Sequence, residues 1–389
     1  MDGITLNRPL TYPFALRLVF SLAVASVSGT LAWAGHAELL PLALILPAAW
    51  ALAPCRLCAG AVAFVYHVAA ARDVPQGAAI FFGTADVSGW FLVIGAGLLY
   101  ALPFAALWSR SLAAWRGLMA LLLVSLPPIG VFGWANPITA AGVLFPGARW
   151  LGLAAVIALF AALTRWPLLA LPLPLIVIVI QVEPPTAPVG WVAHNTSFLM
   201  ASGQQDYLAD AQRQLSIIED VYQSDAKVVV LPETIVGRWS DASIFLWGEL
   251  AQHAQNEGQT VLFGAELANG TGYTNSVLRL DSEGAVPVYR QLMPVPVSMW
   301  KPWTDTGASP QWFEIQTAII DGHRAAFLIC YEQLMAWPPL VAMLGDPDVL
   351  VGVSNDWWAR GTSIPGIQRS ALIAWSRLFD TKLIFAVNE

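Results

Sequence analysis

The chain has 389 residues, of which 57% are hydrophobic and only 12% are charged, and its mean hydropathy is +0.61. A typical soluble domain carries about 25% charged residues, so this composition excludes an ordinary cytoplasmic globular protein and a disordered chain. The net charge of −7 and the pI near 5.2 also exclude a nucleic-acid-binding protein, which would present a basic surface.

The charged residues are distributed unevenly along the chain. Residues 1–182 contain 8 Lys/Arg and 4 Asp/Glu, whereas residues 183–389 contain 11 Lys/Arg and 22 Asp/Glu. This split predicts two domains: a polytopic α-helical membrane domain over residues 1–182, and a globular domain over residues 183–389 that is long enough to bury a core.

Apolar stretches close to the length of a bilayer crossing recur in the first domain and predict about seven transmembrane helices. The expected spans are Phe14–Trp33, Leu39–Ala53, Leu57–Ala71, Trp90–Trp108, Leu118–Trp134, Leu151–Leu163 and Pro167–Ile180. With a cytoplasmic N-terminus, the inner loops hold Arg8, Arg56, Arg110, Arg116 and Arg165, and the outer loops hold Arg72 and Arg149. Because cytoplasmic loops are enriched in basic residues, this bias places the globular domain outside the cytoplasm.

The seventh span decides this orientation. It contains Pro167, Pro172 and Pro174, and its β-branched stretch Leu175–Ile180 would also suit an extended strand. Six crossings would leave the globular domain in the cytoplasm; we favour seven.

The three cysteines give no metal or disulfide signal. Cys55 and Cys58 form a C-x-x-C pattern, which we interpret as two small apolar residues between helices, because a redox or metal pair would need further ligands nearby. Cys330 stands alone in the globular domain, so that domain has no internal disulfide. We expect no metal and no cofactor.

The globular domain alternates short apolar strands with helices, which predicts a layered α/β fold. The expected strands are Val189–Phe198, Lys227–Leu231, Thr260–Gly264, Ser276–Asp281, Ala285–Tyr289, Ala325–Ile329, Val349–Val353 and Lys382–Val387. The expected helices are Asp206–Ser224, Ile244–Asn256 and Ile364–Phe379.

Polar residues follow three of these strands directly. Glu233 follows the second strand, Cys330 the sixth, and Asn355 with Asp356 the seventh. Ligand chemistry gathers where the strands of such sheets end, so a carboxylate, a thiol and an amide–acid pair are expected to converge. Taken singly, each residue also fits a structural role as a cap, a core residue or a turn former.

The sequences around these residues resemble motifs of the nitrilase (carbon–nitrogen hydrolase) superfamily. The resemblance rests on Val229–Glu233, Ile329–Glu332 and Val353–Trp358. The helical first half, Tyr273–Ser276 and Ile364–Gln368 look like the apolipoprotein N-acyltransferases, and Met293–Trp300 looks like a shorter branch of plasmid conjugal transfer proteins. The resemblance implies an αββα sandwich, shortened at its C-terminus, because the chain stops where N-acyltransferases continue with more strands and a final helix.

The resemblance also implies roles for site residues. Cys330 is the expected nucleophile of a thioester, Glu233 the expected base, and Glu332 a supporting acid, with Tyr331, Asn355 and Trp357 lining or supporting the pocket. The family also uses a lysine where the oxyanion forms, and the chain has no lysine in that motif, which reads Tyr289-Arg290-Gln291-Leu292-Met293-Pro294. Arg290 or Lys301 is the candidate cation in its place.

Two functions follow from this reading. One is an inner-membrane enzyme with a periplasmic domain that performs acyl transfer or amide hydrolysis on a lipid or protein, with a phospholipid as acyl donor. The other is a catalytically lapsed scaffold for conjugative pilus or mating-channel proteins, favoured by the missing lysine. The expected partners are membrane lipids and conjugation or pilus proteins, without nucleic acid.

Overall fold

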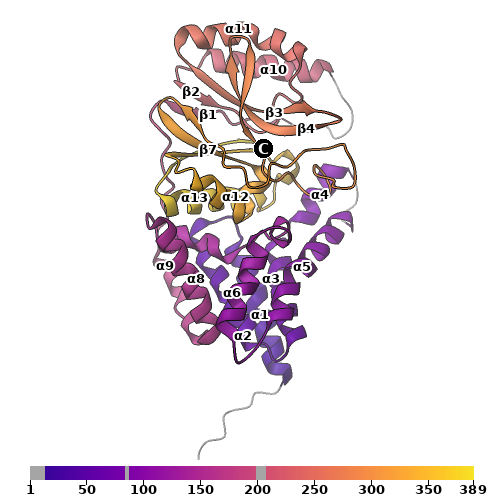
Figure 1. Cartoon of the computed structure of the whole chain (residues 1–389), viewed down its shortest axis with the longest axis vertical. Coiled ribbons are helices and arrows are strands. Elements are labelled where there is room, and N and C mark those ends of the chain that lie inside the picture. The colour runs from indigo at the N-terminus through magenta and orange to yellow at the C-terminus, as the bar shows by residue number, and fades with distance from the viewer. Residues whose placement is uncertain (1–13, 84–86, 199–206) are drawn as a thin grey trace, which may run out of the picture.

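The computed structural model describes residues 14–83, 87–198 and 207–389. It consists of a helical region (residues 14–179) at one end and an α/β region (residues 191–389) at the other (Figure 1). Arg8 and Asp206, which the sequence placed in a loop and at a helix start, lie outside the described residues.

The helical region is built from α-helices and short 3-10 helices (η). They are α1 (Phe14–Ala32), η1 (Ala37–Leu44), α2 (Ile45–Leu52), α3 (Arg56–Ala70), α4 (Val74–Phe82), α5 (Val87–Leu107), α6 (Ala113–Ser125), η2 (Ile129–Val131), η3 (Pro137–Ala140), α7 (Ala141–Leu144), α8 (Arg149–Arg165), η4 (Pro167–Ala170) and α9 (Leu173–Val179). The stretch after Pro167 is helical rather than extended, although its prolines divide it into η4 and α9.

Two helices in the described part of the chain are long and apolar enough to cross a membrane. They are α1 and residues 89–107 of α5. The pair α3 and α4, bent by 55° at the break between them, would supply a third crossing if it acts as one span. The full count of seven crossings stays a prediction.

The α/β region contains two sheets. Its elements are β1 (Trp191–Ala193), α10 (Tyr207–Tyr222), β2 (Val228–Val230), α11 (Asp241–Glu257), β3 (Thr260–Asn269), β4 (Gly272–Asp281), β5 (Gly284–Arg290), β6 (Ala318–Ile320), β7 (His323–Ile329), η5 (Cys330–Leu334), α12 (Trp337–Leu344), β8 (Val349–Asn355), η6 (Trp357–Ala359), α13 (Ile364–Phe379) and β9 (Lys382–Asn388). The sheet orders are β1-β2-β3-β4-β5 and β6-β7-β8-β9. The sequence did not predict β6 or α12.

These elements stack in four layers. The helices α10 and α11 cover the outer face of the five-stranded sheet, where Ile217 and Trp247 pack with Phe263. A second core, which includes Val230, Phe327 and Val351, fills the space between the two sheets. The β-branched and aromatic residues of the strands suit such a face. The helices α12 and α13 then lie between the four-stranded sheet and the helical region (Figure 1).

The helical and α/β regions share one continuous hydrophobic core. It joins buried residues of α7 and α8 to the buried face of α13, including Trp375 and Leu378. The contact is close, because a Cβ on Gly142 in α7 would fall inside the Ala374 carbonyl of α13. Polar contacts also cross the junction: Arg149 pairs with Asp346. This packing brings the helical region up to the ends of the strands that carry the candidate site.

Candidate active site

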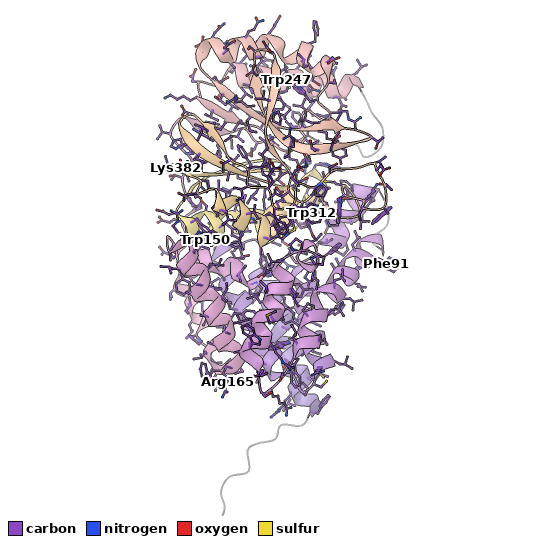
Figure 2. All side chains as sticks on the ribbon, viewed as in Figure 1. Phe91, Trp150, Arg165, Trp247, Trp312 and Lys382 are labelled. Atoms are coloured by element: carbon purple, nitrogen blue, oxygen red, sulfur yellow. The ribbon has the colours of Figure 1, made fainter. Side chains whose placement is uncertain are left out.

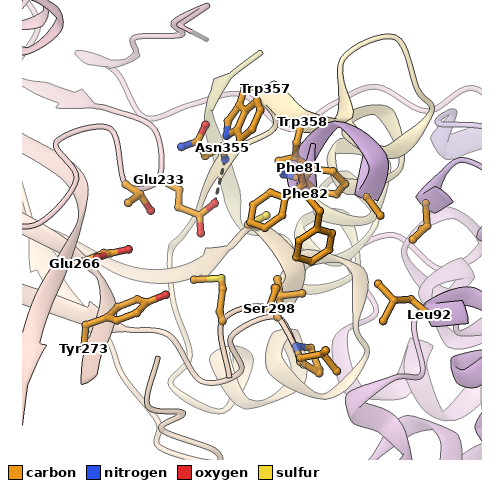
Figure 3. A pocket seen from close by; sticks show the side chains of 18 residues that line it. Phe81, Phe82, Leu92, Glu233, Glu266, Tyr273, Ser298, Asn355, Trp357 and Trp358 are labelled. Atoms are coloured by element: carbon orange, nitrogen blue, oxygen red, sulfur yellow. Dashed lines mark hydrogen bonds between the residues drawn. The ribbon is translucent and has the colours of Figure 1, made fainter. Parts of the chain in front are cut away.

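The structure brings together the residues that follow three strands. Glu233 follows β2, Cys330 follows β7, and Asn355 ends β8. The strands β7 and β8 are parallel neighbours, with Ile329 opposite Val353, so their carboxyl ends lie at one edge. The three side chains line one cavity (Figure 3).

Cys330 occupies a sharp turn between β7 and η5. Its φ is +45°, in the left-handed region that side chains with a Cβ adopt rarely, and its side chain is buried. Such strain persists where the surrounding structure enforces it, which is common at functional sites.

Glu332 holds this turn in place. Its carboxylate accepts hydrogen bonds from the backbone N–H groups of Ile329 (2.7 Å), Leu292 (2.6 Å) and Met293 (3.2 Å), and from the hydroxyl of Tyr289 (2.9 Å). Burial nevertheless raises the pKa of Glu332 to about 8, against the effect of these hydrogen bonds. Glu332 therefore ties the loop after β5 to the cysteine turn and does not line the cavity.

Glu233 is buried against Cys330 and is held from two sides. Its Oε1 accepts a hydrogen bond from Asn275 Nδ2 at 2.7 Å, and its Oε2 accepts one from the backbone N–H of Asn355 at 3.0 Å. Burial raises the pKa of Glu233 to about 7, while hydrogen bonds from Asn275 and the Cys330 side chain act in the opposite direction. A carboxyl group with this pKa suits a general base near neutral pH.

A reaction at the Cys330 thiol would need such a base. The pKa of Cys330 lies well above the ordinary value, first because the thiol is buried and then because Glu233 and Asp356 place negative charge nearby. The thiol is therefore protonated at neutral pH, and reaction requires that its proton be removed as the sulfur attacks.

A second buried acid lies beside the cysteine. Asp356 accepts a hydrogen bond from Ser354 Oγ at 2.5 Å, and burial raises its pKa to about 7. The amide of Gln368 fits best with Nε2 donating to Asp356 at 2.7 Å. This orientation replaces a 3.6 Å contact from Gln368 Nε2 to Cys330 Sγ, because an amide nitrogen is a better partner for a carboxyl group than for a thiol.

The candidate cations do not line this cavity. Arg290 is exposed and lines a separate hollow with Gln311 and Glu314. Lys301 is half-buried in the loop after β5, and within the described chain the cavity lining contains neither lysine nor arginine. Arg290 and Lys301 as catalytic groups thus stay hypotheses that require movement.

The side chain that reaches the site from the end of β5 is Gln291, which the sequence reading did not select. Gln291 is buried; its Nε2 donates to the carbonyl of Ile329 at 3.1 Å, and its Oε1 accepts from Asn275 Nδ2 at 3.0 Å. Asn275 therefore links Gln291 to Glu233. Asn275 lies inside the Tyr273–Ser276 motif, which was the available signal for it.

The cavity has a volume of about 360 Å³ and mostly apolar walls. Glu233, Glu266 and Tyr273 lie on one side of it, and Phe81 and Phe82 of α4 lie on the other (Figure 3). Its remaining lining residues are Val74, Ala78, Leu92, Thr234, Val295, Pro296, Val297, Ser298, Met299, Cys330, Asn355, Trp357 and Trp358. The cavity therefore lies between the helical and α/β regions.

The expected supporting residues divide into two groups. Asn355 and Trp357 line the cavity, as the sequence reading proposed. Tyr331 does not; its hydroxyl donates to the carbonyl of Val131 at 2.8 Å and links the cysteine turn to the helical region.

Comparison with known proteins identifies the family to which the chain belongs. The family model described as carbon–nitrogen hydrolase matches residues 99–377, and the chain belongs to the carbon–nitrogen hydrolase family. Within it, the chain is similar to two proteins named TraB. It is 36% identical over 379 residues to the probable conjugal transfer protein TraB of Sinorhizobium fredii (94% of this chain, 97% of that protein). It is also 36% identical over 397 residues to the conjugal transfer protein TraB of Agrobacterium fabrum (96% and 92%).

Solved structures with a related fold include an amidase from Nesterenkonia sp. It is 15% identical to this chain, with a TM-score of 0.38, and the match covers 52% of this chain and 78% of the amidase. A CN-hydrolase superfamily protein from Xanthomonas campestris is also 15% identical, with a TM-score of 0.36 and coverage of 50% and 74%.

Proposed function

We propose that this protein is an integral membrane acyltransferase or amidase that works through a thioester at Cys330. The observation that carries the proposal is the cavity: the thiol and its neighbouring carboxyl group lie in a space whose opposite wall is α4, with Leu92 of α5 beside it. An apolar chain could lie along Phe81, Phe82 and Leu92 while its carbonyl group meets Cys330.

The surface of the helical region supports a place in the membrane. Large apolar side chains are exposed on α1, α5, α8 and α9, including Val19, Phe91, Leu151 and Ile178. Many exposed apolar side chains on neighbouring helices suit contact with lipid or protein. The proposal takes residues 1–182 as a polytopic membrane domain of about seven crossings.

The arginines support the expected orientation. Arg72 donates to Ser363 Oγ, and Arg149 pairs with Asp346, so both arginines of the expected outer loops contact the α/β region. Arg165 lies at the opposite end of the helical region (Figure 2). With the arginine-rich end in the cytoplasm, the α/β region faces the periplasm across the inner membrane.

The chemistry needs only Cys330 and Glu233 for its proton transfers. The thiol proton passes to the Glu233 carboxylate as Sγ attacks the acyl carbonyl carbon of a phospholipid. The ester C–O bond breaks, and Glu233 returns the proton to the leaving alkoxide. An amine or water then attacks the thioester and gives its proton to Glu233, which protonates the Cys330 thiolate as the C–S bond breaks.

A scaffold role is the second candidate, and one observation favours it. Gln291 is neutral, and both ends of its amide are already hydrogen-bonded to protein groups. Among the described residues, the lining of the cavity thus offers no preorganised cation to stabilise an oxyanion. In this role the protein would support conjugation or pilus proteins, in line with the names of its TraB relatives.

Mass spectrometry of the full-length protein separates the two candidates. The protein is incubated in vesicles of a phospholipid with one defined acyl chain, and the Cys330 peptide is examined. We expect an adduct with the mass of that acyl chain on Cys330, and we expect neutral hydroxylamine to release it. The adduct should be absent in Cys330→Ala. In Glu233→Gln its rate of formation should fall by about 10²–10⁴-fold. If the folded protein forms no adduct and Cys330→Ala transfers plasmid normally at normal protein levels, the scaffold role holds.

A further inference from the structure

A pair of thiols lies at the end of the helical region opposite the α/β region. Cys55 caps the N-terminus of α3, and Cys58 lies in its first turn. Their Sγ atoms are 2.7 Å apart, and the backbone N–H of Cys58 donates to Cys55 Sγ at 3.3 Å. Both cysteines are free.

The two thiols differ in access and in their electrostatic surroundings. Cys55 is partly exposed, beside the exposed Arg56 and Leu57, whereas Cys58 is buried. Cys55 lies at the N-terminus of α3, and a helix N-terminus favours a thiolate.

The Cys55 sulfur also acts as the cap of the helix. Ser, Thr, Asp and Asn are the usual cap residues because their oxygen accepts well, and a neutral thiol is a weak acceptor. The hydrogen bond from Cys58 holds the pKa of the Cys55 thiol below its ordinary value. The neighbouring thiol thus makes Cys55 a better nucleophile.

The sequence alone favoured two small apolar residues here, but the two sulfurs lie in contact, and we propose that Cys55 and Cys58 form a redox-active dithiol that exchanges with a disulfide-bearing partner. The Cys55 thiolate attacks one sulfur of the partner disulfide; that S–S bond breaks, and one partner thiolate leaves and takes up a proton. Cys58 then loses its proton and attacks the Cys55 sulfur, which releases the second partner thiol. The pair becomes an intramolecular disulfide, and its two electrons reduce the partner.

This activity is separate from acyl transfer. The far end of α3 is followed by Arg72, which contacts Ser363 of the α/β region, and the 15 residues of α3 span roughly 22 Å. Oxidation of the pair therefore leaves Cys330 untouched, and the proposal does not depend on the function of that site.

Glutathione disulfide is a suitable probe. The full-length protein in detergent is equilibrated with mixtures of reduced and oxidised glutathione, acid-quenched, alkylated and analysed as peptides. We expect the Cys55–Cys58 peptide to lose two hydrogens as the oxidised fraction rises. Cys58→Ser should trap a glutathione adduct on Cys55, and Cys55→Ser should form at least about tenfold less adduct on Cys58, because Cys58 is buried and Cys55 is partly exposed.

The control is Cys330→Ala, which keeps the pair and should titrate like the wild type. The proposal is overturned if the wild-type peptide stays reduced at every mixture. It is equally overturned if Cys58→Ser and Cys55→Ser form adducts at the same rate, because Cys55 would then have no special role.

Discussion

At the end of β5, next to the turn that carries Cys330, side chains alternate between buried and exposed positions. Along the end of β5, Tyr289 points inward and is buried, Arg290 points outward and is exposed, and Gln291 is buried again. Successive side chains of a strand alternate between faces, so Arg290 cannot replace an inward-facing lysine without a shift in register. The sequence analysis named Arg290 or Lys301 as the cation of this motif, whereas the side chain that the structure buries next to the cysteine turn with hydrogen bonds to Asn275 and to the Ile329 carbonyl is Gln291.

Gln291→Lys should restore a cation to the site. An ammonium group beside Asn275 would favour the charged form of the nearby Glu233, so the pKa of Glu233 should fall from about 7 by about one unit or more. Alkylation of Cys330 by iodoacetamide should then rise with pH at a correspondingly lower pH than in the wild type. Gln291→Met, of similar size and neutral, is the matched control; an identical pH profile in the Lys and Met variants would contradict the prediction.

The buried carboxyl group of Glu332 should make stability depend on pH. Its pKa is raised to about 8 in the folded protein, so between the ordinary carboxyl value and about 8 the folded state binds more protons than the unfolded state. Stability from this group is therefore fully present at low pH and is lost as the pH rises through about 8. The melting temperature should fall over this range, and Glu332→Gln should flatten the fall; an equally steep profile in the variant would exclude Glu332 as the cause.

At the scale of elements, the sequence analysis predicted the strands that carry the site but did not predict α4. The strands β2, β7 and β8 are short β-branched or apolar runs that end in polar residues, and this pattern fixes both the sheet and the convergence of Glu233 with Cys330. The sequence of α4 does contain residues typical of helix ends: Pro75 lies in its first turn, and Gly83, in the left-handed conformation, follows its last turn. Its role depends on packing, since Gly77 lies directly against the Trp358 ring, and sequence alone does not show that contact.

Asp73 should anchor α4 to the site. Its carboxylate accepts hydrogen bonds from both the backbone N–H and the hydroxyl of Ser363, just before α13. Asp73→Ala leaves these donors without a partner, so we expect a loss of about 1–3 kcal/mol in unfolding free energy and slower acylation of Cys330. Chemical denaturation and the vesicle assay measure the two effects, and Asp73→Asn, which keeps an acceptor, should retain more of both. Equal losses in Asn and Ala variants would contradict the anchor.

At the scale of the whole molecule, composition predicted the two regions but not how they join. The charge split separates residues 1–182 from 183–389; in the structure, α9 ends at Val179 and β1 begins at Trp191. Composition cannot show that both faces of α13 are buried. The sequence of such a helix differs at only a few positions from that of an amphipathic helix with one exposed face. The cavity that Cys330 and Glu233 line also lies where the two regions meet, between α4 and the α/β region.

The orientation of the molecule can be tested with reporter fusions. Alkaline phosphatase folds only outside the cytoplasm, so a fusion after residue 389 should be active and a fusion after Arg165 inactive if the chain crosses seven times. Immunoblots confirm equal amounts of each fusion. Activity of the Arg165 fusion, or inactivity of the fusion after residue 389, would support a different topology.

The close contact of Gly142 with the Ala374 carbonyl has a consequence for how this protein can be divided. The charge distribution suggests an acidic catalytic unit that could be produced alone and moved onto other anchors. Cutting the chain near residue 182 would instead uncover the apolar face of α13, including Trp375 and Leu378, and remove the α4 wall of the cavity. The helical and α/β regions therefore form one packed unit, and a transfer of the cavity to another protein would have to include the helices.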